Sequence, residues 1–274
     1  MARQAIDRDR VTHPPLPLRL LRATGRFRRF RGLSVLLRMY RTLIPAKSRF
    51  RVDDFDGTLS LTVDIRETIG VNLWHRPEQY ERCERELFCS AIRPGSTVLD
   101  VGANIGIYTL LAAKREASVF AIEPDPDNAL QLRRHVQMNG LSNLVTVLEM
   151  AATDSKGQVA LYKNPANSGG STLFGTGYAI HIAGNTIDSL DLPPLDVCKI
   201  DAEGAEAIVL EGMQRTLARS PNMKLLVEYV DHFTGSAKLL ALIRSEFSSI
   251  SVVGGASLGK CDHPPEYCNL WATH

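Results

Sequence analysis

Apolar and polar residues follow two different periods along the chain after Thr97. Short apolar runs predict strands, and the stretches between them repeat apolar residues at the spacing of one helical face. Strands that alternate with helices indicate an α/β fold, with a doubly wound, mostly parallel sheet that carries helices on both faces. The predicted strands are 97–101, 118–123, 144–150, 158–162 (an extra strand), 195–201 and 224–230, with a closing antiparallel pair at 249–254 and 267–272, and the predicted helices are 105–114, 126–139, 205–217 and 236–245.

The chain before Thr97 has a different pattern. Residues 49–74 resemble short strands with a hairpin turn at Asp56 and Gly57, and residues 78–91 fit a helix. Further upstream, apolar residues recur on one helical face between residues 33 and 43. The predicted parts are a basic N-terminal extension at 1–48, a small strand and helix module at 49–94, and the main α/β domain at 95–274.

Charge is unevenly distributed over an otherwise ordinary composition. Hydrophobic residues make up 44% and charged residues 23% of the 274 residues, which is typical of a globular protein with a sizeable core. Residues 1–51 carry fourteen Arg or Lys against Asp7 and Asp9, a net charge of +12, and the rest of the chain carries −10. We therefore expect the helix at 33–43 either to pack on its own domain or to contact an anionic membrane through a basic amphipathic face.

Three features of the sequence bear on location. It contains no apolar stretch of about 18 residues, so no membrane-spanning helix is expected. It also lacks an N-terminal apolar run followed by a small-residue cleavage site, so no secretory signal is expected. The five cysteines include no CxxC pair and are odd in number, which favours free thiols in a reducing compartment. We expect a cytoplasmic protein, with peripheral membrane contact through the basic N-terminus left open.

A glycine-rich turn between the first main strand and its helix is the strongest local signal. In the run VLDVGANIGIYTLLAA the strand ends at Asp100, and Gly102, Asn104 and Gly106 lie in the turn. Gly102 permits a tight turn, Gly106 permits close approach of helix and strand, and the helix start presents unpaired amides to an anionic group. Glu123 ends the next strand, where a carboxylate can accept hydrogen bonds from both ribose hydroxyls. These five residues are the predicted cofactor-binding set.

The chemistry of this turn favours S-adenosylmethionine over a dinucleotide. A dinucleotide site prefers GxGxxG, because a small middle residue lets the backbone meet the pyrophosphate. Here the run is Gly-Ala-Asn-Ile-Gly, and the side-chain amide of Asn104 suits the carboxylate or amine of an amino acid better. A nicotinamide-dependent oxidoreductase is the main alternative enzyme class.

Ionisable residues gather where the fourth and fifth predicted strands end. LDVCKIDAEGAE puts Lys199, Asp201 and Glu203 at the end of the fourth strand, and LLVEYVDHF puts Glu228 and His232 at the end of the fifth. Ligands in open α/β sheets bind at the carboxyl ends of the strands, beside the switch point in strand order. We therefore expect these groups to line a polar floor under the reactive centre. A salt-linked turn that caps a helix is the alternative interpretation.

The predicted catalytic residues are Asp201, Glu203 and His232. An enzyme that transfers an activated methyl group must align the reacting atoms and accept the proton of the acceptor hydroxyl. The same carboxylates also suit Mg²⁺, but no loop pattern specifies a metal, and no metal ligand is predicted. The Gly- and Ser-rich loop at 164–178 either closes over the ligand or is a mobile connection.

Three motifs together resemble the FkbM family of methyltransferases. They are DVGANIG at 100–106, AIEPDPDN at 121–128 and KIDAEGAE at 199–206, within a resemblance that covers roughly residues 95–235. The resemblance implies a class I methyltransferase-like (Rossmann-like) fold, with a seven-stranded sheet and one antiparallel strand. It also implies O-methylation of a hydroxyl on a sugar, glycan or secondary metabolite. The basic N-terminus and the C-terminal tail lie outside this resemblance.

Two further alternatives concern partners. A non-catalytic module that only binds cofactor would have little reason to keep the polar set at 199–203. A nucleic-acid partner is not expected, because no base-flipping motif is present and aromatic residues do not interleave with the Arg cluster. The expected partner is therefore a small-molecule or glycan acceptor.

Overall fold

The structure is a computed structural model that describes residues 11–12, 48–164, 168–255, 257–258 and 262–274. The helix expected at 33–43 lies outside these residues. By its internal contacts the chain separates into two compact units, residues 1–80 and 81–274. The three-part division at 48 and 94 stays a prediction. None of the helices in the described ranges is both long and apolar enough to cross a membrane.

The first unit contains a small antiparallel hairpin. Its loop, residues 56–58, has Asp56 at φ 46° and Gly57 at φ 83°, two consecutive positive values that are typical of hairpin turns. The hairpin predicted from Asp-Gly is therefore confirmed. The elements are β1 (Val11–Thr12), β2 (Arg49–Phe55), β3 (Leu59–Val63) and α3 (Thr68–His75), with sheet order β1-β2-β3.

The strand expected after residue 65 is wrong, because this segment forms α3. A short apolar run fits a buried strand and a buried helix equally well, so its period alone does not distinguish them. Leu73 and Trp74 are fully buried on this helix. A Cβ at Gly70 would collide with the carbonyl oxygen of Asp64, so this glycine lets α3 pack closely on the end of β3.

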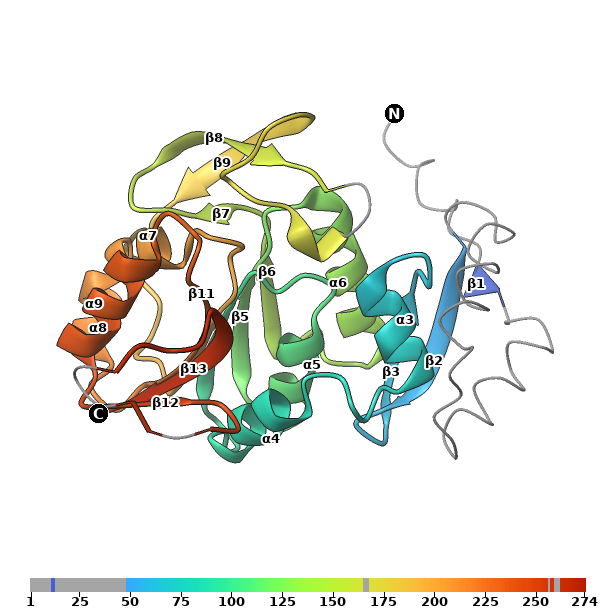
Figure 1. Ribbon diagram of the computed structural model, residues 1–274. Coiled ribbons are helices and arrows are strands. Elements are labelled where there is room, and N and C mark those ends of the chain that lie inside the picture. Colours follow the sequence, from blue (N-terminus) through green and yellow to red (C-terminus); the bar gives the residue numbers. More distant parts are fainter. Residues whose placement is uncertain (1–10, 13–47, 165–167, 256, 259–261) are drawn as a thin grey trace. The chain divides into compact units, whose positions relative to one another are not determined.

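The second unit is built on a seven-stranded sheet with the order β12-β13-β11-β10-β4-β5-β6 (Figure 1). All neighbouring strands are parallel except at β13, which runs antiparallel to both β11 and β12. The predicted doubly wound, mostly parallel seven-stranded sheet with one antiparallel strand is confirmed. The strands are β4 (Thr97–Val101), β5 (Ser118–Ile122), β6 (Val145–Leu148), β10 (Val197–Ile200), β11 (Lys224–Val230), β12 (Ser249–Val252) and β13 (Tyr267–Thr273).

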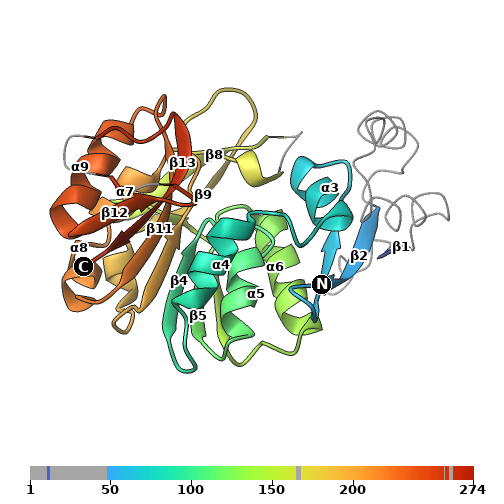
Figure 2. The same cartoon turned by 60° about the horizontal axis from the view of Figure 1, so that its bottom comes forward.

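Helices cover both faces of this sheet, with α4, α5 and α6 on one face and α7, α8 and α9 on the other (Figure 2). The single helix predicted at 205–217 is wrong, because it breaks at Gly212. A Cβ there would collide with the carbonyl oxygen of Thr153, so close backbone packing interrupts the helix at this glycine. The helices are α4 (Arg82–Ser90), α5 (Ile107–Ala113), α6 (Pro126–Met138), α7 (Glu206–Glu211), α8 (Gln214–Arg219) and α9 (Ser236–Glu246).

The chain between β6 and β10 forms a second, separate sheet of three strands with the order β7-β9-β8. The extra strand predicted at 158–162 is confirmed as β8, but its partner β9 was not predicted. The run AIHIAGN of β9 is mostly half-exposed, and His181 and Gly184 interrupt its apolar pattern. The elements are β7 (Ala151–Ala152), β8 (Gly157–Tyr162), η1 (Ser168–Gly170), β9 (Ala179–Asn185) and η2 (Ile187–Leu190).

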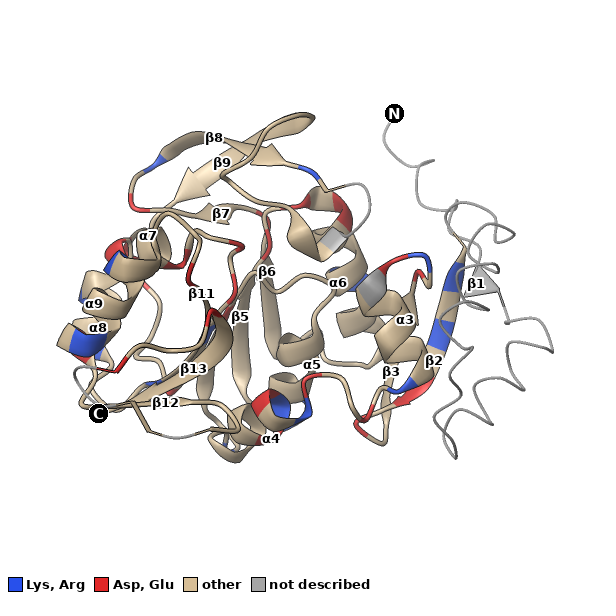
Figure 3. Cartoon of the chain, in the orientation of Figure 1, with Lys and Arg blue, Asp and Glu red and all other residues tan. Residues whose placement is uncertain are grey.

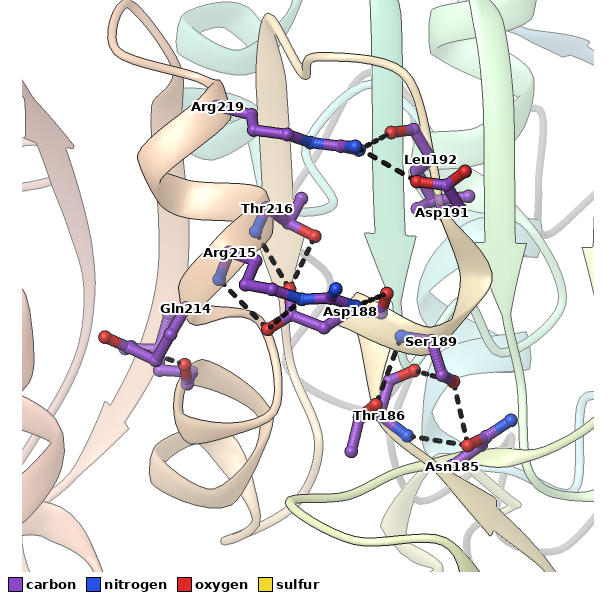
Figure 4. Close-up of polar contacts among 11 residues, drawn as sticks. Asn185, Thr186, Asp188, Ser189, Asp191, Leu192, Gln214, Arg215, Thr216 and Arg219 are labelled. Carbon is purple, nitrogen blue, oxygen red and sulfur yellow. Dashed lines mark hydrogen bonds and ion pairs between the residues drawn. The ribbon is translucent and has the colours of Figure 1, made fainter.

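A carboxylate in η2 caps α8 from outside that helix (Figure 4). Asp188 Oδ2 accepts a hydrogen bond from the Arg215 amide at 2.9 Å, and Oδ1 accepts from the Thr216 amide and from Thr216 Oγ1, both at 2.8 Å. Helix N-termini leave amides unpaired, and a carboxylate satisfies them while opposing the positive end of the helix dipole. We call Asp188, Arg215 and Thr216 the Asp188 clamp.

Candidate functional site

The first motif forms a turn from β4 into α5, and its two glycines are required by the packing of the chain itself. Gly102 has φ 74° and Gly106 has φ 96°, which other residues adopt only with strain. A Cβ at Gly102 would collide with the carbonyl oxygen of Asp201, and one at Gly106 would collide with Leu132 of α6. The expected close approach at Gly106 is therefore real, but it is to a side chain of α6 and not to a strand.

Two buried oxygen atoms at this turn lack a hydrogen-bond partner among the described residues. Asp100 is 1% exposed, and its Oδ2 accepts from Thr109 Oγ1 at 2.6 Å while its Oδ1 accepts nothing. Asn104 has φ 50°, and its Oδ1 is buried and also without a partner. Burial raises the pKa of Asp100 against the opposing charge of Lys199. Unsatisfied buried acceptors are costly, so this pair marks a place where a ligand donor would be stabilised.

Glu123 follows β5 at the same edge, but its carboxylate is buried and already contacts the chain. It is 4% exposed, Oε2 accepts from the Asn104 amide at 2.7 Å, and Oε1 accepts from the Asp125 amide at 2.9 Å. Burial raises the pKa of Glu123 to about 7 in spite of these bonds. Each carboxylate oxygen offers two lone pairs, so ribose hydroxyls would add to the amide bonds or displace them.

The end of β10 lies beside the glycine turn, as the predicted strand order required. Asp100 of β4 pairs in register with Lys199 of β10, and the Asp201 amide donates to the Val101 carbonyl at 3.0 Å. Ligands of open α/β sheets bind at this point of the strand order. Asp201 thus lies at the switch point, with its backbone carbonyl packed against Gly102.

Lys199 is a buried cation that holds Asp201 in place. Its Nζ donates to Asp201 Oδ2 at 2.9 Å and lies 4.8 Å from the centre of the Tyr108 ring, and the Tyr108 hydroxyl donates to Glu81 at 2.8 Å. Burial alone would lower the pKa of Lys199, but the charges of Asp201, Asp100 and Glu81 raise it above its usual value. The Asp201 side chain remains 33% exposed, so Lys199 fixes its orientation while solvent still reaches it.

Four carboxylates surround this point, and we call Asp201, Glu203, Glu206 and Glu228 the acidic edge. Figure 3 shows acidic residues along the loops that follow the central strands. Burial, together with the charges of Asp201 and Glu206, raises the pKa of Glu203 to about 7. Burial and the charge of Asp201 raise the pKa of Glu228 to about 8, although Tyr267 donates to it at 2.9 Å.

Glu206 is the structural member of the acidic edge. Its Oε1 accepts from the Ala202 amide at 2.8 Å and from the Gly204 amide at 3.1 Å, which fixes the turn that carries Glu203. Glu203 itself has φ 51°, an uncommon value for a residue with a side chain. Within the described ranges, no three His, Cys, Asp or Glu side chains are grouped as metal ligands would be.

A pocket of about 230 Å³ opens beside the acidic edge. Of the predicted catalytic residues, Glu203 and His232 line this pocket, whereas Asp201 does not and lies two residues before Glu203. The structure thus brings Glu203 and His232 to one cavity. The remaining lining residues are Gly170, Thr172, Phe174, Gly204, Phe233 and Thr234.

The loop predicted at 164–178 contributes one wall of the pocket. Thr172 Oγ1 donates to the Glu203 carbonyl at 2.7 Å, and the Thr172 amide donates to the Tyr162 carbonyl at 3.1 Å. The loop is therefore tied to both β8 and the acidic turn at Thr172. Phe174 lines the pocket and is 52% exposed, while Tyr178 does not line it and is 72% exposed.

Three contributing residues were missed from the sequence. Glu206 stands two residues after a glycine at a helix start, a position where a capping carboxylate is common, and this signal was available. Tyr267 and Tyr108 reach the site only through strand pairing and helix packing between distant segments. A single sequence carries no signal for such contacts.

Comparison with known proteins places these features in a family. A family model described as the methyltransferase FkbM domain matches residues 100–249. The chain is 30% identical over 122 residues to hexuronic acid methyltransferase AglP of Haloferax volcanii. The aligned residues make up 43% of this chain and 50% of that protein. The chain thus spans about half the length of this curated relative. The resemblance predicted from the three motifs is confirmed.

Solved structures of low sequence identity are also similar. The methyltransferase FkbM from Methylobacillus flagellatus KT has a TM-score of 0.46 and 19% identity, with 73% of this chain and 53% of that chain covered. A SAM-dependent O-methyltransferase from Thermotoga maritima has a TM-score of 0.44 and 11% identity, with 70% of this chain and 65% of that chain covered.

Proposed function

Since the chain belongs to the methyltransferase FkbM family, we propose that it transfers a methyl group from S-adenosylmethionine to a hydroxyl of a sugar, glycan or secondary metabolite. Family membership favours methyl transfer over the hydride transfer of a nicotinamide-dependent enzyme. The relative from Haloferax volcanii is named for a hexuronic acid, which supports a sugar-containing acceptor among these classes. The observation that carries the proposal is the position of Asp201 at the switch point, behind the glycine turn and held by Lys199.

The residues at the turn fit the polar groups of S-adenosylmethionine. Its ammonium group is a donor that suits the unpartnered oxygens of Asp100 and Asn104. Its ribose hydroxyls suit Glu123, whose Oε2 retains a free lone pair, while Oε1 accepts from the Asp125 amide and from Asn128 Nδ2 at 3.5 Å. We therefore assign these three side chains, with the backbone of Gly102 and Gly106, to the cofactor.

Within this proposal Asp201 acts on the acceptor. The bound cofactor supplies an electrophilic methyl group, and the protein must orient the acceptor oxygen and take its proton. Asp201 is the carboxylate that Lys199 positions and solvent still reaches, so it accepts the proton. Glu203 and His232 line the neighbouring pocket, where they orient the acceptor.

Calorimetry with S-adenosylhomocysteine and NAD tests the cofactor assignment. The wild-type chain should bind S-adenosylhomocysteine and not NAD. Glu123→Ala should weaken this binding by about 1–3 kcal/mol, the usual contribution of hydrogen bonds to a charged group. Glu149→Ala is the matched control, because Glu149 is an exposed carboxylate after the next strand, paired with Arg133. Unchanged affinity in Glu123→Ala would remove this residue from the ribose site.

We also propose that the basic N-terminal segment contributes to contact with anionic membranes and takes no part in cofactor binding. Its excess of Arg and Lys ends at residue 51, whereas the cofactor motifs begin at residue 98. Each basic residue near an anionic surface contributes about 1 kcal/mol to membrane binding at low salt. Sedimentation of the full chain with anionic and neutral vesicles tests this proposal. Equal recovery with both vesicles would instead favour packing of the segment on its own domain.

A further inference from the structure

The pocket beside the acidic edge has two aromatic walls. A Cβ at Gly204 would lie 3.4 Å from Cδ2 of Phe233 and 3.6 Å from Cδ2 of Phe174, so both rings approach this glycine. Gly204 has φ 99° and leaves the floor between the rings uncovered. The volume of about 230 Å³ is below the range of about 300–1,000 Å³ typical of sites for drug-sized ligands. The pocket therefore fits one ring-sized group and not a complete cofactor.

The remaining side chains of the lining are polar and include two threonine hydroxyls. Thr234 and His232 contribute from the loop after β11, and Glu203 contributes from the turn after β10. Aromatic faces pack against apolar C–H groups, and the polar side chains exchange hydrogen bonds with hydroxyls. A hexose ring has both properties, with C–H groups on its faces and hydroxyls around its edge.

The charges near the pocket select against an anion. No Arg or Lys is among its lining residues in the described part of the chain. The nearby cation, Lys199, is 5% exposed and paired with Asp201. Recognition of a carboxylate ordinarily uses Arg or Lys, and a carboxylate placed beside Glu203 would meet a like charge.

We propose that this pocket is the acceptor subsite, that it binds an uncharged hexose ring between Phe174 and Phe233, and that it rejects the corresponding uronate. This assignment rests on the proposed methyl transfer, because Asp201 stands two residues before Glu203 at the pocket. The ring hydroxyl nearest the acidic edge is then the one that Asp201 deprotonates.

Ligand-observed saturation-transfer NMR on the full chain tests the assignment. The protein is saturated with S-adenosylhomocysteine and held at pH 8, and the probes are methyl glucoside and methyl glucuronoside. The glucoside should bind at least about tenfold more tightly than the glucuronoside, since like charges at close range in a partly buried site repel by more than 1 kcal/mol. Glu203→Gln should reduce this preference by raising binding of the glucuronoside.

Two matched variants locate the binding. Phe174→Ala should weaken glucoside binding by about fivefold or more, because it removes one aromatic wall. Tyr178→Ala, which removes another exposed aromatic side chain of the same loop but outside the pocket, should leave binding unchanged. Binding of S-adenosylhomocysteine with no glucoside binding, equal or tighter binding of the glucuronoside, or no effect of Phe174→Ala would each overturn the acceptor assignment. If the wild-type protein did not bind S-adenosylhomocysteine at all, the proposed methyl transfer would be overturned instead.

Discussion

The second unit holds carboxylates in two contrasting clusters, the Asp188 clamp with a single carboxylate and the acidic edge with four. In the Asp188 clamp, each oxygen of one carboxylate accepts hydrogen bonds from amides at a helix start. In the acidic edge, burial and the charge of Asp201 act on both Glu203 and Glu228, and together they raise their pKa to about 7 and 8. In the Asp188 clamp, hydrogen bonds compensate the negative charge. In the acidic edge, several negative charges lie close together and oppose one another.

The difference indicates what each cluster is for. A buried carboxylate with satisfied hydrogen bonds stabilises the fold, because its partners would otherwise be unpaired. Buried carboxylates that repel one another lower stability, and such groups gather at functional sites. The Asp188 clamp is therefore expected to stabilise the fold without affecting turnover, whereas Asp201, Glu203 and Glu228 of the acidic edge are expected to support turnover at some cost in stability.

The largest expected effect is on turnover in Asp201→Asn. The amide keeps the shape of the side chain but cannot accept a proton, so turnover should fall by about 10²-fold or more while affinity for S-adenosylhomocysteine is retained. Transfer of labelled methyl to an identified acceptor measures this, with circular dichroism to verify the fold. His232→Ala then shows whether a second group shares the proton. Near-normal turnover in folded Asp201→Asn would exclude it as the catalytic base.

The next effect is on stability in Asp188→Ala. Removing this carboxylate leaves the Arg215 and Thr216 amides without their acceptor, and loss of such a cap costs about 2 kcal/mol. For a chain of this size we expect a fall in Tm of about 4–8 °C. Thermal unfolding measures this, and affinity for S-adenosylhomocysteine should not change. A stable Asp188→Ala protein with impaired cofactor binding would show that the clamp belongs to the site and would break the comparison.

The main sheet was predictable because its strands are short apolar runs separated by helical periods. Prediction failed where tertiary packing decides local structure. Gly212 divides a continuous helical pattern into α7 and α8 because the backbone of Thr153, just after β7, approaches it, and β9 forms because β8 offers it a partner. Neither cause is visible in a window of the sequence around the element itself.

The candidate site was predictable in its positions but not in its energetics. Motif order and strand ends placed Asp201 and Glu123 at one edge, because the carboxyl ends of parallel strands lie together. The depth of Glu123, its bond to the Asn104 amide and its raised pKa follow from a fold around it that no local pattern encodes. The aromatic walls of the pocket also depend on a loop whose path is fixed by Thr172.

A smaller effect is expected on the pH dependence of stability in Glu228→Gln. The pKa of Glu228 is about 8 in the folded protein against an ordinary value of 4.5, so the folded state retains a proton that the unfolded state has lost. Stability due to this group is therefore complete below pH 4.5 and falls as the pH rises through 8. Because the site is partly open to solvent, we expect Glu228→Gln to be more stable by about 1 kcal/mol at pH 9 and equal to the wild type near pH 4.

Urea unfolding at several pH values measures this difference. Gln retains an oxygen that can accept from Tyr267, so the hydrogen bond does not confound the comparison. Glu149→Gln is the control, because that carboxylate is exposed and paired with Arg133. A constant offset between wild type and Glu228→Gln at every pH would show that packing, and not repulsion within the acidic edge, sets the stability of this region.

The smallest effect is expected at the ion pair next to the Asp188 clamp, in Asp191→Asn. Asp191 is 89% exposed and pairs with Arg219 at 3.0 Å, and exposed pairs of this kind contribute about 0–1 kcal/mol. Asn tolerates the positive φ of 47° at this position, and Arg219 keeps its hydrogen bond to the Leu192 carbonyl. Asp191→Asn should therefore change the free energy of unfolding by less than about 0.5 kcal/mol, with little dependence on salt. If Asp191→Asn destabilised the protein as much as Asp188→Ala, the surface ion pair would hold α8 in place to the same extent as the capping of its amides. The contrast between a hydrogen-bonded carboxylate and a group of mutually repelling carboxylates would then no longer explain the two clusters.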